Sequence, residues 1–302
     1  MTAALALWLL ALAGQEQEIF EFRVDVTRVY VDVFVSRQGK AVSDLEASNF
    51  EVYDNGVRQQ VELTDAASVP KTFALLLDES GSITGRKQHL LEEALLDFTG
   101  RLSDKDELTV LSFAERAVLR HPLAFARPDN ETDAYRIKGG GWTAFNDALF
   151  LTLTYLRNAK GRPILVVFTD GMDNTSWIGE EAVLESARSS EAVIYAVKAD
   201  VGTGAQVGGT VVPAGSSGQS AAMLDELTRM TGGLSLEAGR ADAISAAFQG
   251  VLSDVSTRYL LTFSPGTKAK PGLHELIVRI GGVRDVEVRA RASYFMPSNS
   301  NR

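Results

Sequence analysis

Residues 73–82 read FALLLDESGS, and this stretch decides the fold. Its first five residues are all apolar, with no polar residue between them that would leave one side of a strand in water. A strand of this kind is buried on both faces, as in parallel sheets covered by helices. The pattern Asp-x-Ser-x-Ser follows at once and places Asp78, Ser80 and Ser82 on a tight turn. Three oxygen-bearing side chains at a strand end indicate a site for a hard cation.

The chemistry of such a site favours an acidic ligand. Mg²⁺ takes oxygen ligands in near-octahedral geometry, usually keeps some of its waters, and is seldom enclosed by a complete protein cage. Hydroxyl ligands contribute no charge, so a site with two or three hydroxyls and one or two carboxylates leaves the cation incompletely neutralised. A carboxylate brought by a second molecule can then complete the coordination.

Three motifs together resemble the von Willebrand factor type A domain and its metal-ion-dependent adhesion site. FALLLDESGSI resembles the first strand and metal loop of that family, GGWTAFNDAL at residues 140–149 its threonine loop, and ILVVFTDG at residues 164–171 its fourth strand. The resemblance implies binding of Mg²⁺ or Mn²⁺. By this match the metal ligands are Asp78, Ser80, Ser82, Thr143 and Asp170.

The resemblance has one departure at the threonine loop. Trp142 stands where the family often has a second glycine directly before the threonine, which affects the loop shape and the ligand preference. We expect Trp142, Asp173 and Asn174 to form the rim of the ligand-binding surface, although residues like Asp173 and Asn174 are more often plain turn residues. Thr143 stands near the N-cap of a helix expected over residues 143–156, and this role is compatible with metal binding.

The rhythm of strands and helices over residues 69–256 predicts a doubly wound, mostly parallel α/β sheet. Ligands bind such sheets at the carboxyl ends of the strands, where Asp78 and Asp170 stand. We expect a short helix over residues 224–230 and a closing helix over residues 243–255. Residues 200–220 are rich in glycine and predict a long loop, either a rim of the binding surface or an inert insertion.

Segments with strand-like alternation lie on both sides of this domain. The Asp54-Asn55-Gly56 sequence predicts a β-hairpin in the first set, and residues 286–292 alternate as one strand in the second. Because each set alone is thin, we expect residues 15–68 and 257–297 to pair into one Ig-like β-sandwich, with the α/β domain inserted and a tail at residues 298–302. The stretches VSDLEASNFEVYDNGVRQQV and YLLTFSP resemble exported bacterial von Willebrand factor A-related proteins, best known from Acidobacteria.

The composition of the chain and its first residues exclude several classes of function. The net charge of −9 and the lack of any basic run argue against a nucleic-acid partner. Residues 1–14 predict a signal peptide, although they lack the usual Lys or Arg, and hence an exported protein, periplasmic or secreted. No later segment is long and apolar enough to predict a membrane span. The chain has no cysteine, so cysteine zinc sites are excluded.

These observations leave one leading hypothesis for the function and two alternatives. The leading hypothesis is a metal-dependent protein-binding module whose partner presents an Asp or Glu, and the oligomeric state stays open. The first alternative is a structural scaffold in which the metal only stabilises the loops. The second is a metal-assisted hydrolase, which the sequence disfavours because it has only three histidines and neither a nucleophile elbow nor a phosphate loop. We therefore expect no enzymatic activity.

Overall fold

The computed structural model describes residues 28–81, 83–126, 132–199, 206–207, 210–211, 217–239, 243–266 and 269–297. Several predictions from the sequence lie outside these residues. They are the signal peptide at 1–14, the start of the first β segment at 15–27, the proposed ligand Ser82, most of the 200–220 loop and the tail at 298–302.

The α/β part contains a six-stranded sheet in the order β13-β10-β9-β6-β7-β8. Its strands are β6 (Lys71–Asp78), β7 (Glu107–Phe113), β8 (Ala117–Phe125), β9 (Arg162–Thr169), β10 (Val193–Lys198) and β13 (Leu234–Glu237). All neighbours run parallel except β8, which is antiparallel to β7. The chain moves from β6 to β7 on one side and later returns to β9 on the other. The strand order therefore reverses between β6 and β9.

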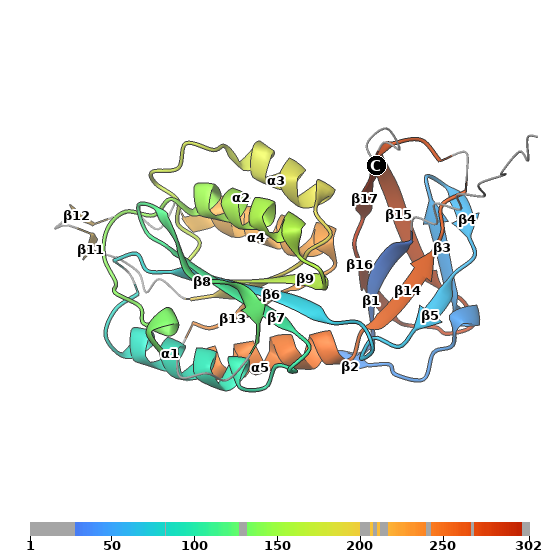
Figure 1. Cartoon of the computed structure of the whole chain (residues 1–302), viewed down its shortest axis with the longest axis horizontal. Helices are drawn as coiled ribbons and strands as arrows, with labels where there is room; N and C mark the ends of the chain where they lie inside the picture. Colours follow the sequence, from blue (N-terminus) through green and yellow to red (C-terminus); the bar gives the residue numbers. More distant parts are fainter. Residues whose placement is uncertain are drawn as a thin grey trace, which may run out of the picture.

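Helices cover both faces of this sheet (Figure 1). On one face lie α1 (Arg86–Thr99) and α5 (Ala243–Ser256), and on the other lie α2 (Phe145–Tyr155), α3 (Glu180–Ser189) and α4 (Ser217–Thr231). Short 3-10 helices are η1 (Ala47–Asn49), η2 (Thr132–Tyr135) and η3 (Leu156–Asn158). Along β6, Phe73, Leu75 and Leu77 enter the first core, whereas Ala74 and Leu76 enter the second. The prediction of a doubly wound α/β fold around a strand buried on both faces is confirmed.

The region predicted as one long loop differs from that prediction at its end. Helix α4 begins at Ser217, before the short helix that we expected over residues 224–230, so the last residues of the 200–220 segment are helical. Two short strands, β11 (Gln206–Val207) and β12 (Thr210–Val211), pair within it. Glycine-rich composition hid both elements, because small residues give no hydrophobic period to read.

The flanking segments form two antiparallel sheets beside the α/β domain (Figure 1). One sheet has the order β16-β1-β14-β5, with β2 paired to β1, and the other has the order β17-β15-β3-β4. The strands are β1 (Val29–Arg37), β2 (Lys40–Ala41), β3 (Phe50–Asp54), β4 (Val57–Gln59), β5 (Glu62–Thr64), β14 (Tyr259–Phe263), β15 (Gly272–Ile280), β16 (Glu287–Ala290) and β17 (Ser293–Met296). Side chains of both sheets share one apolar cluster, which includes Val31, Val52, Leu261 and Tyr294.

Two strand predictions for the flanking segments can be compared with the structure. The Asp54-Asn55-Gly56 hairpin is confirmed, since β3 pairs antiparallel with β4 and both central residues have positive φ, 47° at Asn55 and 80° at Gly56. The strand expected over residues 286–292 is present but shorter, because β16 ends at Ala290 and β17 begins at Ser293 in the other sheet. The backbone N–H of Ala292 instead donates to Met230 in the α/β domain, and this tertiary contact overrides the alternation.

The amino ends of the parallel strands face the flanking sheets. Arg162 begins β9 and pairs with Asp32 of β1. The carboxyl ends of β6 and β9 therefore point away from the flanking sheets. Within the described part of the chain, no helix has the length and apolar character needed to cross a bilayer.

A buried histidine joins three strands of the second flanking sheet. The Nδ1 atom of His274 lies 2.6 Å from Oδ1 of Asp54, and its Nε2 lies 2.6 Å from the carbonyl oxygen of Lys270. The hydroxyl of Tyr294 donates to the other oxygen of Asp54 at 3.0 Å. Both ring nitrogens of His274 face acceptors, so both donate only when the ring is an imidazolium.

This arrangement predicts a stability that falls in mild alkali. Burial alone would lower the pKa of His274, but the hydrogen bonds to Lys270 and Asp54 outweigh it and raise the pKa above 6.5. The stabilisation is therefore fully present below the unfolded-state pKa of 6.5 and is lost as pH rises through the raised value. Urea unfolding of His274→Gln should show a loss of about 1.5–3 kcal/mol at about pH 6, shrinking toward pH 9. An equal loss at all pH values would contradict the charged state of His274.

Candidate metal centre

The two proposed carboxylate ligands lie side by side at the carboxyl edge of the parallel sheet. Asp78 is the last residue of β6, and Asp170 directly follows the last residue of β9. These strands are neighbours, and the register that pairs Leu77 with Phe168 brings Asp78 opposite Thr169. The strand order reverses here, which is where ligands bind in doubly wound sheets.

Asp78 is completely buried and held by hydrogen bonds to both of its oxygens. The backbone N–H of Ser80 donates to Oδ1 at 2.8 Å, and the hydroxyl of Thr169 donates to Oδ2 at 2.8 Å. Burial, and then the negative charge of Asp170, raise the pKa of Asp78 to about 7, although the bonds from Ser80 and Thr169 act in the opposite direction. The pair of carboxylates therefore repel each other in a desolvated site.

Asp170 has a buried oxygen that the described part of the chain leaves without a hydrogen bond. Its Oδ1 accepts from the backbone N–H of Met172 at 3.1 Å, whereas its Oδ2 is buried and makes no hydrogen bond to any described residue. An unpaired buried acceptor of this kind costs about 1–3 kcal/mol. A cation beside Oδ2 would remove that cost and the repulsion from Asp78 together.

The donor set fits a hard divalent cation. Ser80 and Thr143 are also buried, so hydroxyl groups lie on both loops that border Asp78. No group of three His, Cys, Asp or Glu side chains gathers among the residues that the structure describes. Oxygen ligands with few carboxylates suit Mg²⁺ or Mn²⁺. The proposed ligand Ser82 lies outside the described residues.

Backbone hydrogen bonds join the threonine loop to the metal loop. The N–H of Gly140 donates to the carbonyl of Glu79 at 2.8 Å, and the N–H of Gly81 donates to the carbonyl of Gly141 at 3.4 Å. Gly140 and Gly141 have φ values of 138° and 89°, in a region that side chains disfavour. Glycine at these two positions therefore allows the backbone conformation with which the threonine loop reaches the metal loop.

The expected N-cap role of Thr143 is wrong. Helix α2 begins at Phe145, its N-cap residue is Ala144, and no side chain caps it there. Thr143 lies one residue earlier, and its backbone is fixed instead by the loop after β9. Its N–H donates to Oδ1 of Asn174 at 2.8 Å, and its carbonyl accepts from the N–H of Asn174 at 3.0 Å.

Asp173 and Asn174 lie beside the site and bind the threonine loop. One oxygen of Asp173 accepts from the N–H of Asn146 in the first turn of α2 at 2.8 Å, and the other accepts from the N–H groups of Thr175 and Ser176 at 3.3 and 3.2 Å. A carboxylate at this helix end also complements the helix dipole. The structure thus gives Asp173 and Asn174 a positioning role in the threonine loop.

The hydrogen bonds of Asp173 predict that removal of its carboxylate lowers the stability of the fold. Asp173→Ala should lower the free energy of unfolding by about 1 kcal/mol, as for other lost helix N-terminal acceptors. Asp173→Asn keeps one carbonyl acceptor and should lose less. Chemical unfolding of the two variants measures the difference, and equal stability of Asp173→Ala and the wild type would argue against this role.

Three features near the site escape the motif comparison. Glu79 sits inside the Asp-x-Ser-x-Ser motif, but its carboxylate accepts two hydrogen bonds from Arg120 of β8, at 2.6 and 2.8 Å. Arg120 therefore neutralises Glu79, and no local pattern links residues this far apart. Trp177, on the loop after β9, is 96% exposed, whereas the rim residue Trp142 is 50% exposed. The third feature is the hydroxyl of Thr169, which lies inside the Thr-Asp-Gly motif but holds Asp78 and is not one of the expected ligands.

Comparisons with known proteins agree with the α/β fold. Residues 73–172 match the family described as von Willebrand factor type A domain. The match extends from β6 to the loop after β9. Inter-alpha-trypsin inhibitor heavy chain H4 of Bos taurus is 30% identical over 118 residues, which are 35% of this chain and 13% of that protein. The chain thus spans a small part of this relative.

Two solved structures share the fold. The von Willebrand factor type A protein from Catenulispora acidiphila gives a TM-score of 0.52 with 10% identity, covering 92% of this chain and 76% of that one. Proximal thread matrix protein 1 from the mussel byssus gives a TM-score of 0.50 with 16% identity, covering 68% of this chain and 51% of that one. At these identities the likeness concerns the fold alone.

Proposed function

We propose that this protein is an exported, metal-dependent protein-binding module for adhesion or assembly. The observation that carries the proposal is the buried, unpaired Oδ2 of Asp170 beside the fully buried Asp78. A divalent cation, Mg²⁺ or Mn²⁺, would be held by Asp78, Ser80, Ser82, Thr143 and Asp170, the set of a metal-ion-dependent adhesion site. Bound there, it supplies a Lewis-acidic position that accepts a carboxylate oxygen from outside.

The partner in this proposal is a protein that presents an Asp or Glu side chain. Two carboxylates and hydroxyl groups leave a hard dication room for one more anionic ligand. We assign Trp142 to the rim that contacts the partner, because it is half exposed directly before Thr143. Asp173 and Asn174 act at the rim by holding the threonine loop in place.

A non-catalytic role fits the positions of the histidines. His89 pairs with Glu93 on the surface of α1, His121 lies on strand β8, and His274 lies in the core of the flanking sheets. None of the three is on the loops that carry Asp78 and Asp170. The bovine relative is named as a heavy chain of a trypsin inhibitor, which also favours an assembly role over a metal-assisted hydrolase.

The organisation of the whole chain belongs to the same proposal. We place the signal peptide at residues 1–14, the α/β domain at 69–256, and an Ig-like sandwich in the segments 15–68 and 257–297, before a tail at 298–302. The two flanking sheets and their shared core support the sandwich. Export to the periplasm or the medium rests on the signal peptide expected at residues 1–14, and membership of the Acidobacteria-type group rests on the sequence resemblance.

Peptide display on the immobilised protein tests the binding function. Selection in the presence of Mg²⁺ and elution with EDTA should enrich peptides that share an Asp or Glu. Changing that residue to Asn or Gln should abolish binding, and an Asp78→Ala protein should select no EDTA-elutable peptide. If Mg²⁺ raises the melting temperature but no peptide elutes with EDTA, the scaffold alternative replaces this proposal.

A further inference from the structure

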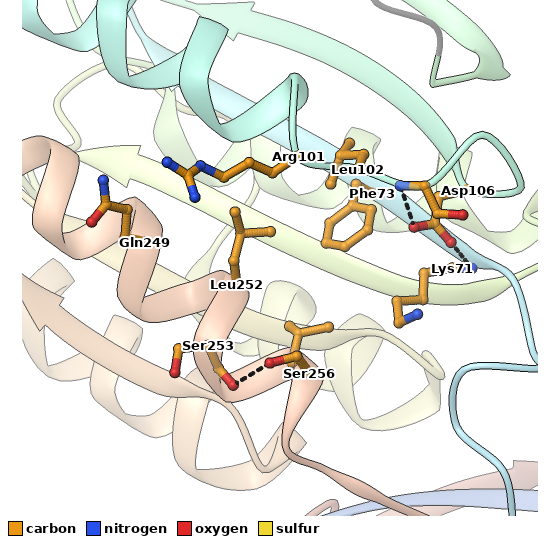
Figure 2. Close-up of a pocket in the computed structure, with 11 residues that line it drawn as sticks. Lys71, Phe73, Arg101, Leu102, Asp106, Gln249, Leu252, Ser253 and Ser256 are labelled. Atoms are coloured by element: carbon orange, nitrogen blue, oxygen red, sulfur yellow. Dashed lines mark hydrogen bonds between the residues drawn. The ribbon is translucent and has the colours of Figure 1, made fainter.

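A groove lies at the opposite edge of the α/β sheet from the metal residues. It has a volume of about 490 Å³ and runs between the ends of α1 and α5 over the first residues of β6 (Figure 2). Lys71 opens β6 at this edge, whereas Asp78 closes it at the other. A volume of this size is typical of small-molecule sites.

The walls of the groove are apolar and its rim is polar. Leu102 and Leu252 supply the apolar surface, and the almost fully buried Phe73 and Val255 belong to the core beneath it. The rim consists of Ser103, Gln249, Ser253 and Ser256. Apolar walls with a few polar groups favour a ligand that has an apolar body and one polar end.

Two of the three charged groups in the groove are already engaged. Asp106 is buried, and its oxygens accept from the backbone N–H groups of Lys71 at 2.9 Å and Ser103 at 3.2 Å. The guanidinium of Arg101 donates to both oxygens of Asp97, with Nε at 3.1 and 3.0 Å. Neither group offers a free charge to a ligand.

Lys71 is the exception. Its side chain is half-buried and extends into the space between Asp106 and Ser256 (Figure 2). Across the residues that the structure describes, its ammonium group makes no ion pair. A cation in a half-apolar groove gains more from an anion than one in open water does.

A second groove has a similar volume, about 480 Å³, but differs from the first in the state of its cationic side chains. It lies between α4 and the flanking sheets, and its three arginines are all engaged: Arg229 with Glu226, Arg289 with Asp254, and Arg291 with backbone carbonyls. Volume alone therefore does not distinguish the groove at Lys71. The distinguishing feature of that groove is the Lys71 ammonium, which has no ion-pair partner among the described residues and lies beside apolar side chains.

We propose that the groove at Lys71 binds an amphipathic carboxylate, such as the anion of a medium-chain fatty acid. The carboxylate pairs with the Lys71 ammonium, and the apolar tail lies along Leu102 and Leu252. Both oxygens of Asp106 already accept backbone hydrogen bonds. This site is separate from the proposed metal site and does not depend on it.

Equilibrium dialysis with decanoate tests the proposal in EDTA, where no metal competes for the carboxylate. The wild type should show saturable binding of one decanoate per chain, and 1-decanol and decylammonium should bind at least about tenfold more weakly, the worth of one charge-assisted hydrogen bond. Lys71→Met keeps most of the stem and should weaken decanoate binding by a similar factor. Leu252→Gln should also weaken it.

Two control variants make the result specific. Lys105→Met removes an exposed lysine outside the groove and should leave decanoate binding unchanged. Asp78→Ala should also leave it unchanged, which separates this site from the metal centre. Absence of saturable binding, equal affinity for decanol, or full decanoate affinity in Lys71→Met would each overturn the proposal.

Discussion

The Asp78→Ala variant is expected to lose Mg²⁺ and Mn²⁺ binding by more than about 100-fold in calorimetric titration, because removal of groups that only orient a ligand already costs up to about 100-fold. The same variant should lose the rise in melting temperature that the cation gives to the wild type. Asp78→Asn should behave alike, since an amide has the shape of the carboxylate but not its charge.

The metal-free stability of the Asp78 variants distinguishes a lost ligand from a lost fold. Asp78 and Asp170 repel each other in a buried site, so a neutral side chain at position 78 removes an unfavourable interaction. Metal-free Asp78→Asn should therefore melt no lower than the metal-free wild type. An Asp78→Asn protein that is unfolded would make Asp78 a structural group.

A matched control lies on the neighbouring loop. Glu115 is exposed, and its carboxylate borders Gly141 without belonging to the proposed ligand set. Glu115→Gln should leave Mg²⁺ affinity nearly unchanged, because an exposed charge in water acts weakly at a distance. If Glu115→Gln reduces affinity as strongly as Asp78→Ala, the site depends on general acidity and the assigned ligand set is wrong.

Local patterns were sufficient to predict the α/β core. An uninterrupted apolar run is buried on both faces only in a covered parallel sheet, and Phe73 to Leu77 alternate between the two cores as that reasoning requires. The neighbouring positions of Asp78 and Asp170 follow from the same logic, since parallel strands end at one edge. For this strand, the local sequence pattern was enough to predict its position in the sheet.

Features that depend on distant residues escaped the same reasoning. Thr143 is followed by a good helix sequence, but the bonds from Asn174 and Asp173 fix the loop and place the helix start at Phe145. The alternation over residues 286–292 breaks because Ala292 bonds to Met230 across the domain boundary. Each of these contacts joins residues separated by tens of positions, and neither partner carries a local signal.

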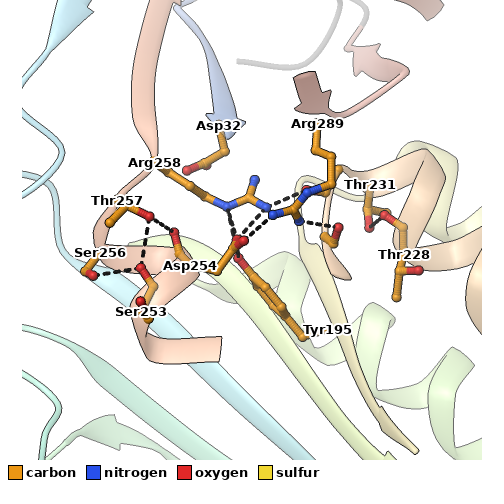
Figure 3. Close-up of polar contacts among 12 residues, drawn as sticks. Asp32, Tyr195, Thr228, Thr231, Ser253, Asp254, Ser256, Thr257, Arg258 and Arg289 are labelled. Carbon is orange, nitrogen blue, oxygen red and sulfur yellow. Dashed lines mark hydrogen bonds and ion pairs between the residues drawn. The ribbon is translucent and has the colours of Figure 1, made fainter. Parts of the chain in front are cut away.

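The largest such feature is a buried ionic cluster between the α/β domain and the flanking sheets (Figure 3). Near the end of α5, one oxygen of Asp254 accepts from the hydroxyl of Tyr195 at 2.6 Å and from Nε of Arg258 at 3.0 Å. Its other oxygen pairs with Arg289 of β16. The side chains of Arg258 and Asp254 are only 1% and 5% exposed.

A second ion pair crosses the same boundary with opposite polarity. Here the α/β domain supplies the cation, Arg162, and the flanking sheet supplies the anion, Asp32. Burial, and then the charge of Arg258, lower the pKa of Arg162 to about 10, so the two arginines are close enough to interact. Each anion therefore compensates cations that would otherwise face one another in a desolvated interface.

Asp254→Ala should lower the free energy of unfolding by about 3–5 kcal/mol in urea denaturation, because it leaves the buried Arg258 and the partly buried Arg289 without their carboxylate. Asp97→Ala is the matched control, since Asp97 and Arg101 have the same four-residue spacing at the exposed end of α1. Water solvates Arg101 once its partner is gone, so that variant should be nearly as stable as the wild type. Equal effects of the two substitutions would show that the Asp254 cluster adds no more than a surface ion pair. A much larger effect at Asp254 would mean that the α/β domain and the flanking sheets are stabilised by the same buried charges.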